Sequence, residues 1–287
     1  MQQVLHEGGP VVALETTLVA HGFPPGVGVE VGQAAEAAVR SERAMAATVG
    51  VLEGQVVVGL DAGELERFGK AGATARKTGP SDLAACVASG ELGATTVGGT
   101  LAAARLAGIR FMGTGGIGGV HRGFAERPDV SADLAQLART PALVVSSGVK
   151  SLLDVPATVE LLETLGVPVL GYRTDELPLF FSAGGGPPVS ARVDDAEQAA
   201  RTAEAHWQLG GAALLLARDP DDGIDVEALI QEGLAAAAAQ GIYGQGVTPY
   251  VLSFLHERSD GRTIEVNREL IVANARLAAQ VAVAASG

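Results

Sequence analysis

Short apolar runs alternate with alanine-rich amphipathic stretches along most of the chain. The runs have the length and β-branched content of strands, and the stretches between them repeat their apolar residues at helical spacing. This alternation predicts an α/β fold in which a largely parallel central sheet is flanked by helices in a three-layer α/β/α arrangement. We expect strands at residues 11–14, 46–51, 55–59, 109–112, 142–146, 167–170 and 213–217.

The amphipathic stretches predict helices between these strands. Asp61 followed by Glu64 has the spacing of a capping box, with Asp where Ser or Thr is more common. We expect helices at residues 29–40, 61–70, 99–107, 156–165 and 194–208.

The last quarter of the chain has a different pattern, because no convincing strand follows residue 225. Three helical stretches are expected there, at residues 225–240, 248–258 and 263–285. We interpret them as a helical cap over one face of the sheet, within a single α/β catalytic domain spanning residues 1–287. Residues 184–188, Gly-Gly-Gly-Pro-Pro, are expected to form a flexible surface loop or lid.

Charge and cysteine content narrow the functional classes. A net charge of −13 argues against binding to nucleic acid or to an anionic membrane surface. The single cysteine, Cys86, excludes an intramolecular disulfide, and its apolar neighbours predict a buried structural thiol. The N-terminus lacks the pattern of a secretory signal, and no uncharged apolar run approaches the roughly 18 residues that span a membrane. We therefore expect a cytoplasmic protein with a small-molecule substrate.

Several predicted strands end in residues suited to chemistry. In open α/β sheets the ligand site lies beyond the carboxyl ends of the strands. The first strand runs into Glu15, the fourth into a glycine-rich loop, the fifth leads to Lys150, and the sixth leads to residues 171–173, Gly-Tyr-Arg. A carboxylate placed directly after a buried run is expected to have a raised pKa, which suits Glu15 to proton transfer near neutral pH.

The glycine-rich loop, residues 113–123, is expected to present backbone amides to one phosphate group. It contains G-x-G-x-x-G, but the proline before the next helix and the missing acidic residue speak against a dinucleotide site. His121 and Arg122 follow the glycines and could complete an anion site, although an arginine beside a turn is often just solvated. Lys77, in a predicted polar turn, could reach a phosphate or face water.

Asp129 and Asp133 are four residues apart, so a helix beginning near Asp129 would place both on one face of its first turn. Ordinary helix capping explains this spacing best. Together with Ser131, the two carboxylates could also hold a divalent cation that keeps several of its waters.

Lys150 is one of three lysines among 20 basic residues. Unlike a guanidinium, an amine can lose its proton and attack a carbonyl carbon to form a Schiff base. A compositional bias toward arginine explains the same scarcity, so the residue count alone leaves both interpretations open.

Taken together, these motifs resemble the pseudouridine-5′-phosphate glycosidase family, also called indigoidine synthase A-like proteins. The resemblance covers nearly the whole chain. It is carried by VALETT (12–17), HG (21–22), GATTV (93–97), TGGIGGVHRG (114–123), DVSADL (129–134), GVKS (148–151) and GVP (166–168).

The resemblance implies a lyase that reversibly cleaves the C–C glycosidic bond of pseudouridine 5′-phosphate to uracil and ribose 5-phosphate. It implies that Lys150 forms a Schiff base with the sugar, that Glu15 donates a proton and that Asp129 binds Mn²⁺. Family members are commonly homotrimers. The substrate-binding positions that it implies are Lys77, Val97, Ser131, Ala132 and Asp133, with Thr114, His121 and Asn274 as further ones.

The implied chemistry fits these residue types. A C-glycoside has no electronegative leaving atom to protonate, so an amine that can form an imine at the sugar carbon is needed. The chain departs from the family pattern in having Thr16 for a common Ser, and residues 79–81, Gly-Pro-Ser, in place of a basic pair. Two alternatives stay open: a Schiff-base lyase or aldolase acting on another sugar phosphate, and a non-catalytic sugar-phosphate-binding protein.

Overall fold

The computed structural model describes residues 8–287, apart from the side chain of Gln245. Residues 1–7, on which the expectation about a secretory signal rests, lie outside this range. None of the helices within the described range combines the length and the apolarity needed to cross a bilayer.

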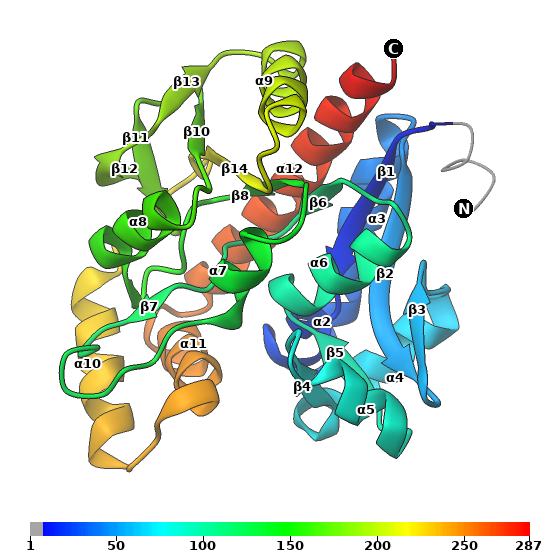
Figure 1. Ribbon diagram of the computed structural model, residues 1–287. Coiled ribbons are helices and arrows are strands. Elements are labelled where there is room, and N and C mark those ends of the chain that lie inside the picture. Colours follow the sequence, from blue (N-terminus) through cyan, green and yellow to red (C-terminus); the bar gives the residue numbers. More distant parts are fainter. Residues whose placement is uncertain (1–7) are drawn as a thin grey trace.

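A ten-stranded sheet runs through the molecule in the order β13-β10-β14-β8-β6-β1-β2-β5-β4, with β3 also paired to β2 (Figure 1). All neighbours from β13 to β2 are parallel, whereas β3 and β5 run antiparallel to β2. The strands are β1 (Val11–Glu15), β2 (Met45–Leu52), β3 (Gln55–Val58), β4 (Arg76–Thr78), β5 (Gly93–Thr95), β6 (Phe111–Gly113), β8 (Leu143–Ser146), β10 (Val169–Tyr172), β13 (Ala191–Val193) and β14 (Leu214–Arg218).

Helices cover both faces of this sheet. On one face α12 (Arg262–Ser286) packs on β1, β6 and β8 and is flanked by α3 (Val27–Ser41) and α9 (Ala196–Gln208). On the other face α6 (Val97–Leu106) packs on β1 and β2 beside α7 (Ala132–Leu137) (Figure 1). The other α-helices are α2 (Thr17–His21), α4 (Ala62–Ala71), α5 (Leu83–Ser89), α8 (Val155–Thr164), α10 (Glu227–Ala239) and α11 (Val247–Arg258).

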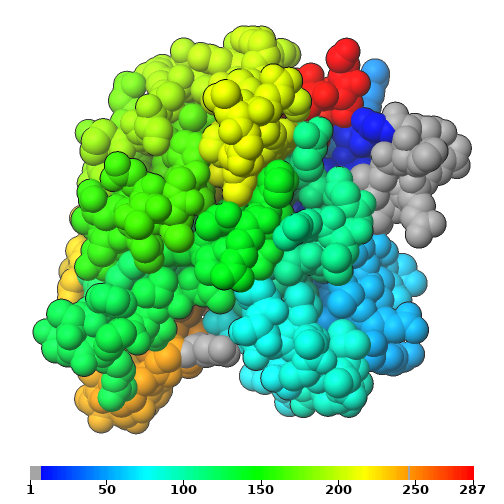
Figure 2. All heavy atoms as spheres, in the orientation of Figure 1, coloured from blue at the N-terminus to red at the C-terminus, as the bar shows by residue number. Residues whose placement is uncertain are grey.

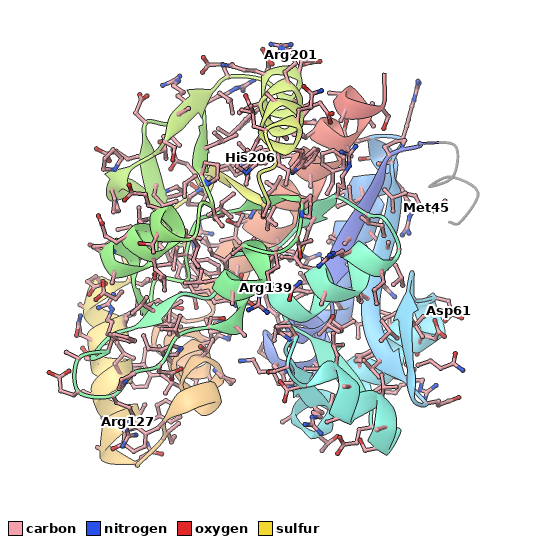
Figure 3. All side chains as sticks on the ribbon, in the orientation of Figure 1. Met45, Asp61, Arg127, Arg139, Arg201 and His206 are labelled. Atoms are coloured by element: carbon pink, nitrogen blue, oxygen red, sulfur yellow. The ribbon has the colours of Figure 1, made fainter. Side chains whose placement is uncertain are left out.

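The local sequence explains these elements. The central strands are almost wholly apolar because both faces are covered, and β8 and β14 bury their leucines and valines completely. The predicted capping box is present at the start of α4, where Figure 3 labels Asp61. Its side chain accepts from the Glu64 amide, while the Glu64 carboxylate accepts from the Asp61 amide, both at 2.8 Å.

The predicted α/β/α fold is confirmed, and every expected strand and helix has a counterpart within a few residues of its expected bounds. Cys86 is buried in α5, as expected. Of the three C-terminal helices, α12 lies over one face of the sheet and belongs to the helical layer there. Only α10 and α11 lie apart from that layer, and they face the carboxyl ends of the strands (Figure 1).

The expectation of a flexible loop at residues 184–188 is wrong. These residues belong to β12 (Ser182–Pro188), which pairs antiparallel with β11 (Glu176–Leu179). Side-chain carboxylates hold the glycine backbone, because the Gly184 amide donates to Asp219 at 2.9 Å and the Gly185 amide to Glu176 at 2.8 Å. Several elements have too few residues to produce a periodic signal. They are the strands β4, β5 and β13, the helices α2, α5 and α7, and a two-stranded ribbon of β7 (Val120–His121) with β9 (Leu153–Asp154).

Candidate active site

The carboxyl ends of three neighbouring strands place the central residues of the site. Glu15 is the last residue of β1, Thr114 follows β6 directly, and Lys150 lies four residues beyond the end of β8. These strands are adjacent in the order β8-β6-β1, so the predicted convergence is confirmed for them. It is wrong for β10, because the Arg173 guanidinium at its end donates to the Asp194 carbonyl at 3.0 Å beside the edge strand β13.

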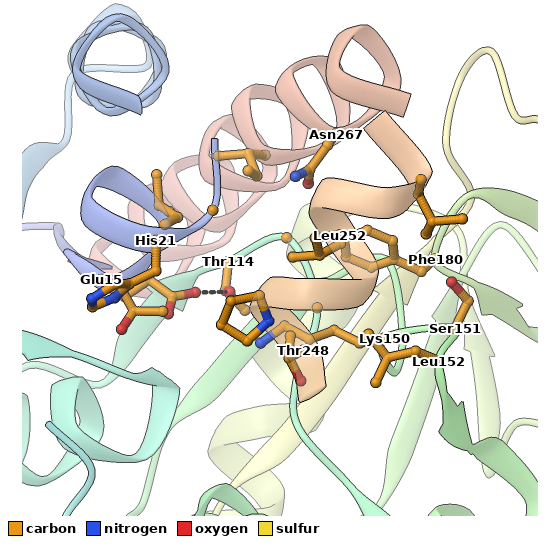
Figure 4. Close-up of a pocket in the computed structure, with 18 of the residues that line it drawn as sticks. Glu15, His21, Thr114, Lys150, Ser151, Leu152, Phe180, Thr248, Leu252 and Asn267 are labelled. Atoms are coloured by element: carbon orange, nitrogen blue, oxygen red, sulfur yellow. Dashed lines mark hydrogen bonds between the residues drawn. The ribbon is translucent and has the colours of Figure 1, made fainter. Parts of the chain in front are cut away.

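Two adjoining pockets lie at these strand ends. The apolar pocket, closed on one side by α11 and α12, includes Glu15, Thr114 and Lys150, and its apolar walls come from Leu18, Leu152, Phe180, Phe181, Leu252 and Ile271 (Figure 4). The polar pocket opens between the residue 79–82 turn and the segment before α11, where Figure 2 shows a notch in the surface. It is lined by Lys77, Ser81, Thr96, His121, Asp129, Ser131, Ala132 and Asp133.

Lys77 and Lys150 lie at the junction, since both line both pockets. Lys77 is a half-buried residue of β4, which corrects the expected polar turn. Burial lowers the pKa of Lys77, and the positive charge of Lys150 lowers it further, against the attraction of Asp133 and Glu15. A ligand spanning the two pockets would pass both amines.

Glu15 is a buried acid. Its residue is 4% exposed, one carboxyl oxygen accepts a hydrogen bond from the Thr114 hydroxyl, and Oε2 has no partner among the described residues. Burial raises the pKa of Glu15, as expected from its position, although Lys150 and the Thr114 hydrogen bond lower it. The carboxyl group is therefore suited to hold and deliver a proton at the apolar pocket.

Asp133 fastens together two walls of the polar pocket. Its Oδ1 accepts from the Gly98 amide in the first turn of α6 at 2.7 Å, and its Oδ2 accepts from the Gly118 amide at 2.9 Å. A side chain at residue 118 would collide with Ser131 and Asp133, which explains the glycine. The Asp133 carboxylate thus accepts a hydrogen bond from Gly118, one of the loop amides that the sequence pattern predicts to bind a phosphate.

Much of the remaining glycine loop is also engaged with the protein itself. The Thr114, Ile117 and His121 amides donate to the carbonyls of Val145, Gly148 and Asp129 at 3.0–3.1 Å. These amides are therefore not available to the phosphate that the loop is expected to bind. Its glycines instead allow the loop to pack closely across the ends of β6 and β8.

The expected helix start at Asp129 is also wrong. Helix α7 begins at Ala132, and its N-cap is Ser131, whose hydroxyl accepts from the Asp133 amide at 3.3 Å. Asp129 and Asp133 therefore do not share a helical turn. Asp133 is buried, whereas the Asp129 carboxylate faces the polar pocket with a third of its side chain exposed.

Asp129 is the residue best placed to bind a cation. His121 Nδ1 lies 3.9 Å from Asp129 Oδ2, and burial lowers the pKa of His121, assisted by the two lysines and opposed by Asp129. Among the described residues, the Asp129 carboxylate forms no ion pair other than this long one with His121, although Lys77 in the same pocket attracts it. No cluster of three acidic, histidine or cysteine side chains suited to a metal occurs within residues 8–287. Mg²⁺ and Mn²⁺ often keep several waters, so one carboxylate ligand fits such an ion.

Arg122 does not belong to an anion site. Its guanidinium donates to the Ser151 carbonyl at 2.7 Å and the Leu153 carbonyl at 3.2 Å, and it forms a two-pronged pair with Glu227 at 2.6 and 3.0 Å. It therefore ties the segment after Lys150 to the start of α10.

Two predicted substrate-binding side chains are buried away from the pockets. Val97 is 1% exposed at the start of α6, and the preceding residue, Thr96, lines the polar pocket. Asn274 is fully buried in α12 and donates to the Thr114 carbonyl at 2.8 Å, and more weakly to the Gly115 carbonyl and the Ser147 hydroxyl. Asn274 supports the loop that carries Thr114 and is not part of the pocket lining.

Sequence reasoning missed two polar residues that do line the apolar pocket. Asn267 lies two helical turns before Asn274, is 4% exposed, and has an Oδ1 without a partner among the described residues. His21, at the end of α2, lies beside Glu15 (Figure 4). The His-Gly pair was visible as a motif, but nothing in the local sequence around Asn267 marks it as functional.

Comparison with known proteins identifies the family. The family described as "Indigoidine synthase A like protein" matches this chain over residues 1–284. The chain belongs to this family. A pseudouridine-5′-phosphate glycosidase from Herpetosiphon aurantiacus is 47% identical over 290 residues, which cover 99% of this chain and 95% of that protein. A second pseudouridine-5′-phosphate glycosidase, from Paracoccus denitrificans, is 44% identical over 98% of this chain and 95% of that protein.

Two solved structures have the same fold. The prealnumycin C-glycosynthase AlnA, solved in complex with ribulose 5-phosphate, superposes with a TM-score of 0.89 at 42% identity, covering 99% of this chain and 94% of its own. An indigoidine synthase A-like protein from Thermotoga maritima gives a TM-score of 0.89 at 37% identity, with coverages of 98% and 94%.

The two departures from the family pattern have a simple structural reading. The Thr16 hydroxyl donates to the Val49 carbonyl and accepts from the Thr95 amide, both at 2.8 Å, so threonine supplies the hydroxyl that serine would. In the residue 79–81 turn, the Gly79 amide donates to Asp82 at 3.2 Å, and Ser81 lines the polar pocket. A hydroxyl is thus present where a basic pair is common.

Proposed function

We propose that this protein is a pseudouridine-5′-phosphate glycosidase that reversibly cleaves the C–C bond of its substrate to give uracil and ribose 5-phosphate. The observation that carries the proposal is the placement of Lys150 at the junction of an apolar and a polar pocket, with the buried acid Glu15 in the apolar one. A flat base suits the first pocket, and a phosphorylated sugar suits the second. The names of the closely similar relatives support this assignment.

The reaction that we propose uses Lys150 as the nucleophile. Its Nζ bonds to the sugar C1′ as the C1′–O4′ bond breaks, and the ring oxygen O4′ takes up the proton that Nζ loses and leaves as a hydroxyl. The nitrogen lone pair then forms a C1′=N bond as the C1′–C5 bond breaks, and C5 of the base takes a proton from Glu15. Water hydrolyses the imine, which releases ribose 5-phosphate and restores the amine.

The other lining residues would bind different parts of the substrate. Lys77 and Ser131 would hold the sugar phosphate, with His121 and Ala132 also lining the polar pocket. Asn267 offers both a donor and an acceptor to the base. Asp129 would hold Mn²⁺, which supplies bound waters and positive charge to orient the substrate when present.

Uracil release tests the proposal directly. Incubation with pseudouridine 5′-phosphate and Mn²⁺ should release uracil, measured by chromatography, and Lys150→Ala should abolish release. The homotrimer expected from the family resemblance is part of the proposal, and sedimentation velocity measures it. No release by folded, metal-loaded protein would refute the glycosidase assignment.

Borohydride trapping separates the alternatives. Reduction in the presence of ribose 5-phosphate should add the sugar phosphate irreversibly to Lys150, which mass spectrometry of the digested protein detects. A non-catalytic binding protein gives no adduct. A lyase or aldolase acting on another sugar phosphate gives the adduct but releases no uracil.

A specific likeness also favours testing synthesis. AlnA is named a C-glycosynthase, and bond formation is the reverse of the cleavage proposed here. Uracil with ribose 5-phosphate should therefore yield pseudouridine 5′-phosphate. Incorporation of a larger aromatic acceptor in place of uracil would assign this chain a synthase role instead.

A further inference from the structure

Three buried polar atoms on residues that line the apolar pocket have no hydrogen-bond partner among the described residues. They are Glu15 Oε2, His21 Nδ1 and Asn267 Oδ1. A buried polar atom without a partner costs free energy, so a ligand that completes these hydrogen bonds is favoured here. The His21 and Asn267 atoms would accept from N–H donors of such a ligand. Glu15 and Asn267 already have roles in the proposed function, but His21 has none.

His21 is an acceptor of defined polarity. Its Nε2 lies 3.0 Å from the Ala75 carbonyl oxygen, which can only accept a hydrogen bond. Nε2 therefore carries the proton, and Nδ1 presents a lone pair. Burial lowers the pKa of His21, and nearby Lys77 lowers it further, so the ring is neutral near pH 7.

The base of a uracil C-glycoside has two N–H donors, and they differ in their surroundings. N3–H lies between two carbonyl groups, so it matches a carboxamide such as Asn267, which both donates and accepts. N1–H lies between one carbonyl and the C6–H bond, so it matches a group that only accepts. In an N-glycoside such as uridine 5′-phosphate, N1 bears the sugar and has no hydrogen.

We propose that His21 Nδ1 accepts a hydrogen bond from N1–H of the base, and that this contact selects C-glycosides over N-glycosides. The inference rests on the proposed function and names a specificity residue for it. Figure 4 places the His21 ring beside Glu15, so the same side of the pocket would hold both the reacting C5 and the N1 edge.

Substrate selectivity tests the assignment. The wild-type protein should cleave N1-methylpseudouridine 5′-phosphate on the order of 100-fold less efficiently than pseudouridine 5′-phosphate, in kcat/KM. His21→Leu removes the acceptor and should lower this ratio at least about tenfold, by slowing the unmethylated substrate. His21→Gln keeps a donor for Ala75 and an acceptor for the base, and should preserve the ratio.

A purely structural role for His21 would lower kcat/KM equally for both substrates, and an unchanged ratio in His21→Leu overturns the proposal. If the variants do not fold, inhibition of the wild-type protein by free bases decides. Uracil should then inhibit at least about tenfold more strongly than 1-methyluracil, and equal inhibition overturns the proposal. Equal cleavage of both substrates by the wild type refutes this inference alone, whereas no cleavage of either refutes the glycosidase assignment and this inference with it.

Discussion

The polar pocket and the apolar pocket share two lysines but are built in different ways. Much of the polar pocket comes from one continuous segment, in which the glycine loop, His121, Asp129 and the start of α7 follow one another within about twenty residues. The apolar pocket is assembled from distant elements: α2, the loop after β8, the β11–β12 connection, α11 and α12.

The two pockets also differ in how their polar atoms are satisfied. In the polar pocket, Asp133 is held by two backbone amides, and Ser131 caps a helix. In the apolar pocket, Glu15, His21 and Asn267 each have a buried atom without a partner among the described residues. The polar pocket therefore has a wall fixed by the protein itself, whereas the apolar pocket has hydrogen-bonding capacity that a ligand can satisfy.

Loss of the shared amine is the largest effect that we expect. Lys150→Ala should lower kcat/KM by about 10⁴-fold or more, because the nucleophile acts on a substrate that spans both pockets. Uracil release and borohydride trapping measure this. Lys70→Ala is the matched control, since Lys70 is exposed on α4 and paired with Glu66 at 3.1 Å. More than about 1% residual activity in Lys150→Ala would assign the imine to another group.

Loss of the acid Glu15 should have the second-largest effect. Glu15→Gln should lower kcat by about 10²- to 10⁴-fold, because the amide keeps the shape but has no proton to give. Wild-type activity should fall as pH rises through the raised pKa of Glu15, since only the protonated form is active. Thr114→Val removes a hydrogen bond that lowers this pKa, so the alkaline limb of the pH–rate profile should move to higher pH. A shift to lower pH would exclude Glu15 as the titrating acid.

The difference between the pockets also explains how far the sequence could predict the site. The α/β/α layers could be predicted because long amphipathic helices and buried parallel strands have clear periodicities. Glu15 and Lys150 could be placed together because both follow strands whose ends meet at one edge of the sheet. Short elements such as β4 and β5 gave no such signal, so Lys77 was expected in a turn.

The apolar pocket could not be predicted in the same way. Asn267 and Asn274 are both buried asparagines on α12, and only the packing of that helix decides which one lines the pocket. The role of the glycine loop was misjudged for a related reason. The sequence pattern predicts that its backbone amides bind a phosphate, but the Asp133 carboxylate accepts a hydrogen bond from one of them, the Gly118 amide.

Asp133→Asn tests the polar pocket separately. The amide replaces one acceptor with a donor that faces the Gly98 or Gly118 N–H, so we expect a loss of about 2 kcal/mol in the free energy of unfolding. The concentration of ribose 5-phosphate that half-saturates borohydride trapping should rise about tenfold or more. Inhibition by free uracil should change little. Urea unfolding and titrated trapping measure these effects, and an equal weakening of uracil would show that the pockets are not separable.

Asn267→Leu makes the opposite test. Removing the carboxamide should weaken inhibition by uracil about tenfold, because the imide edge of the base loses its partner. Trapping of ribose 5-phosphate at Lys150 should be unchanged. Arg268→Ala, at the next and exposed position of α12, is the control. Weaker sugar-phosphate trapping in Asn267→Leu would show that this residue also contributes to sugar-phosphate binding.

The smallest effects should come from the contact that lies outside both pockets. Glu227→Gln weakens a half-exposed ion pair and should cost no more than about 1 kcal/mol of stability. Arg122→Ala also removes two hydrogen bonds to carbonyls just beyond Lys150, at Ser151 and Leu153, and should lower kcat a few-fold while leaving KM nearly unchanged. A matching drop in kcat for Glu227→Gln would mean that α10 itself, through this pair, positions the Lys150 loop between the two pockets.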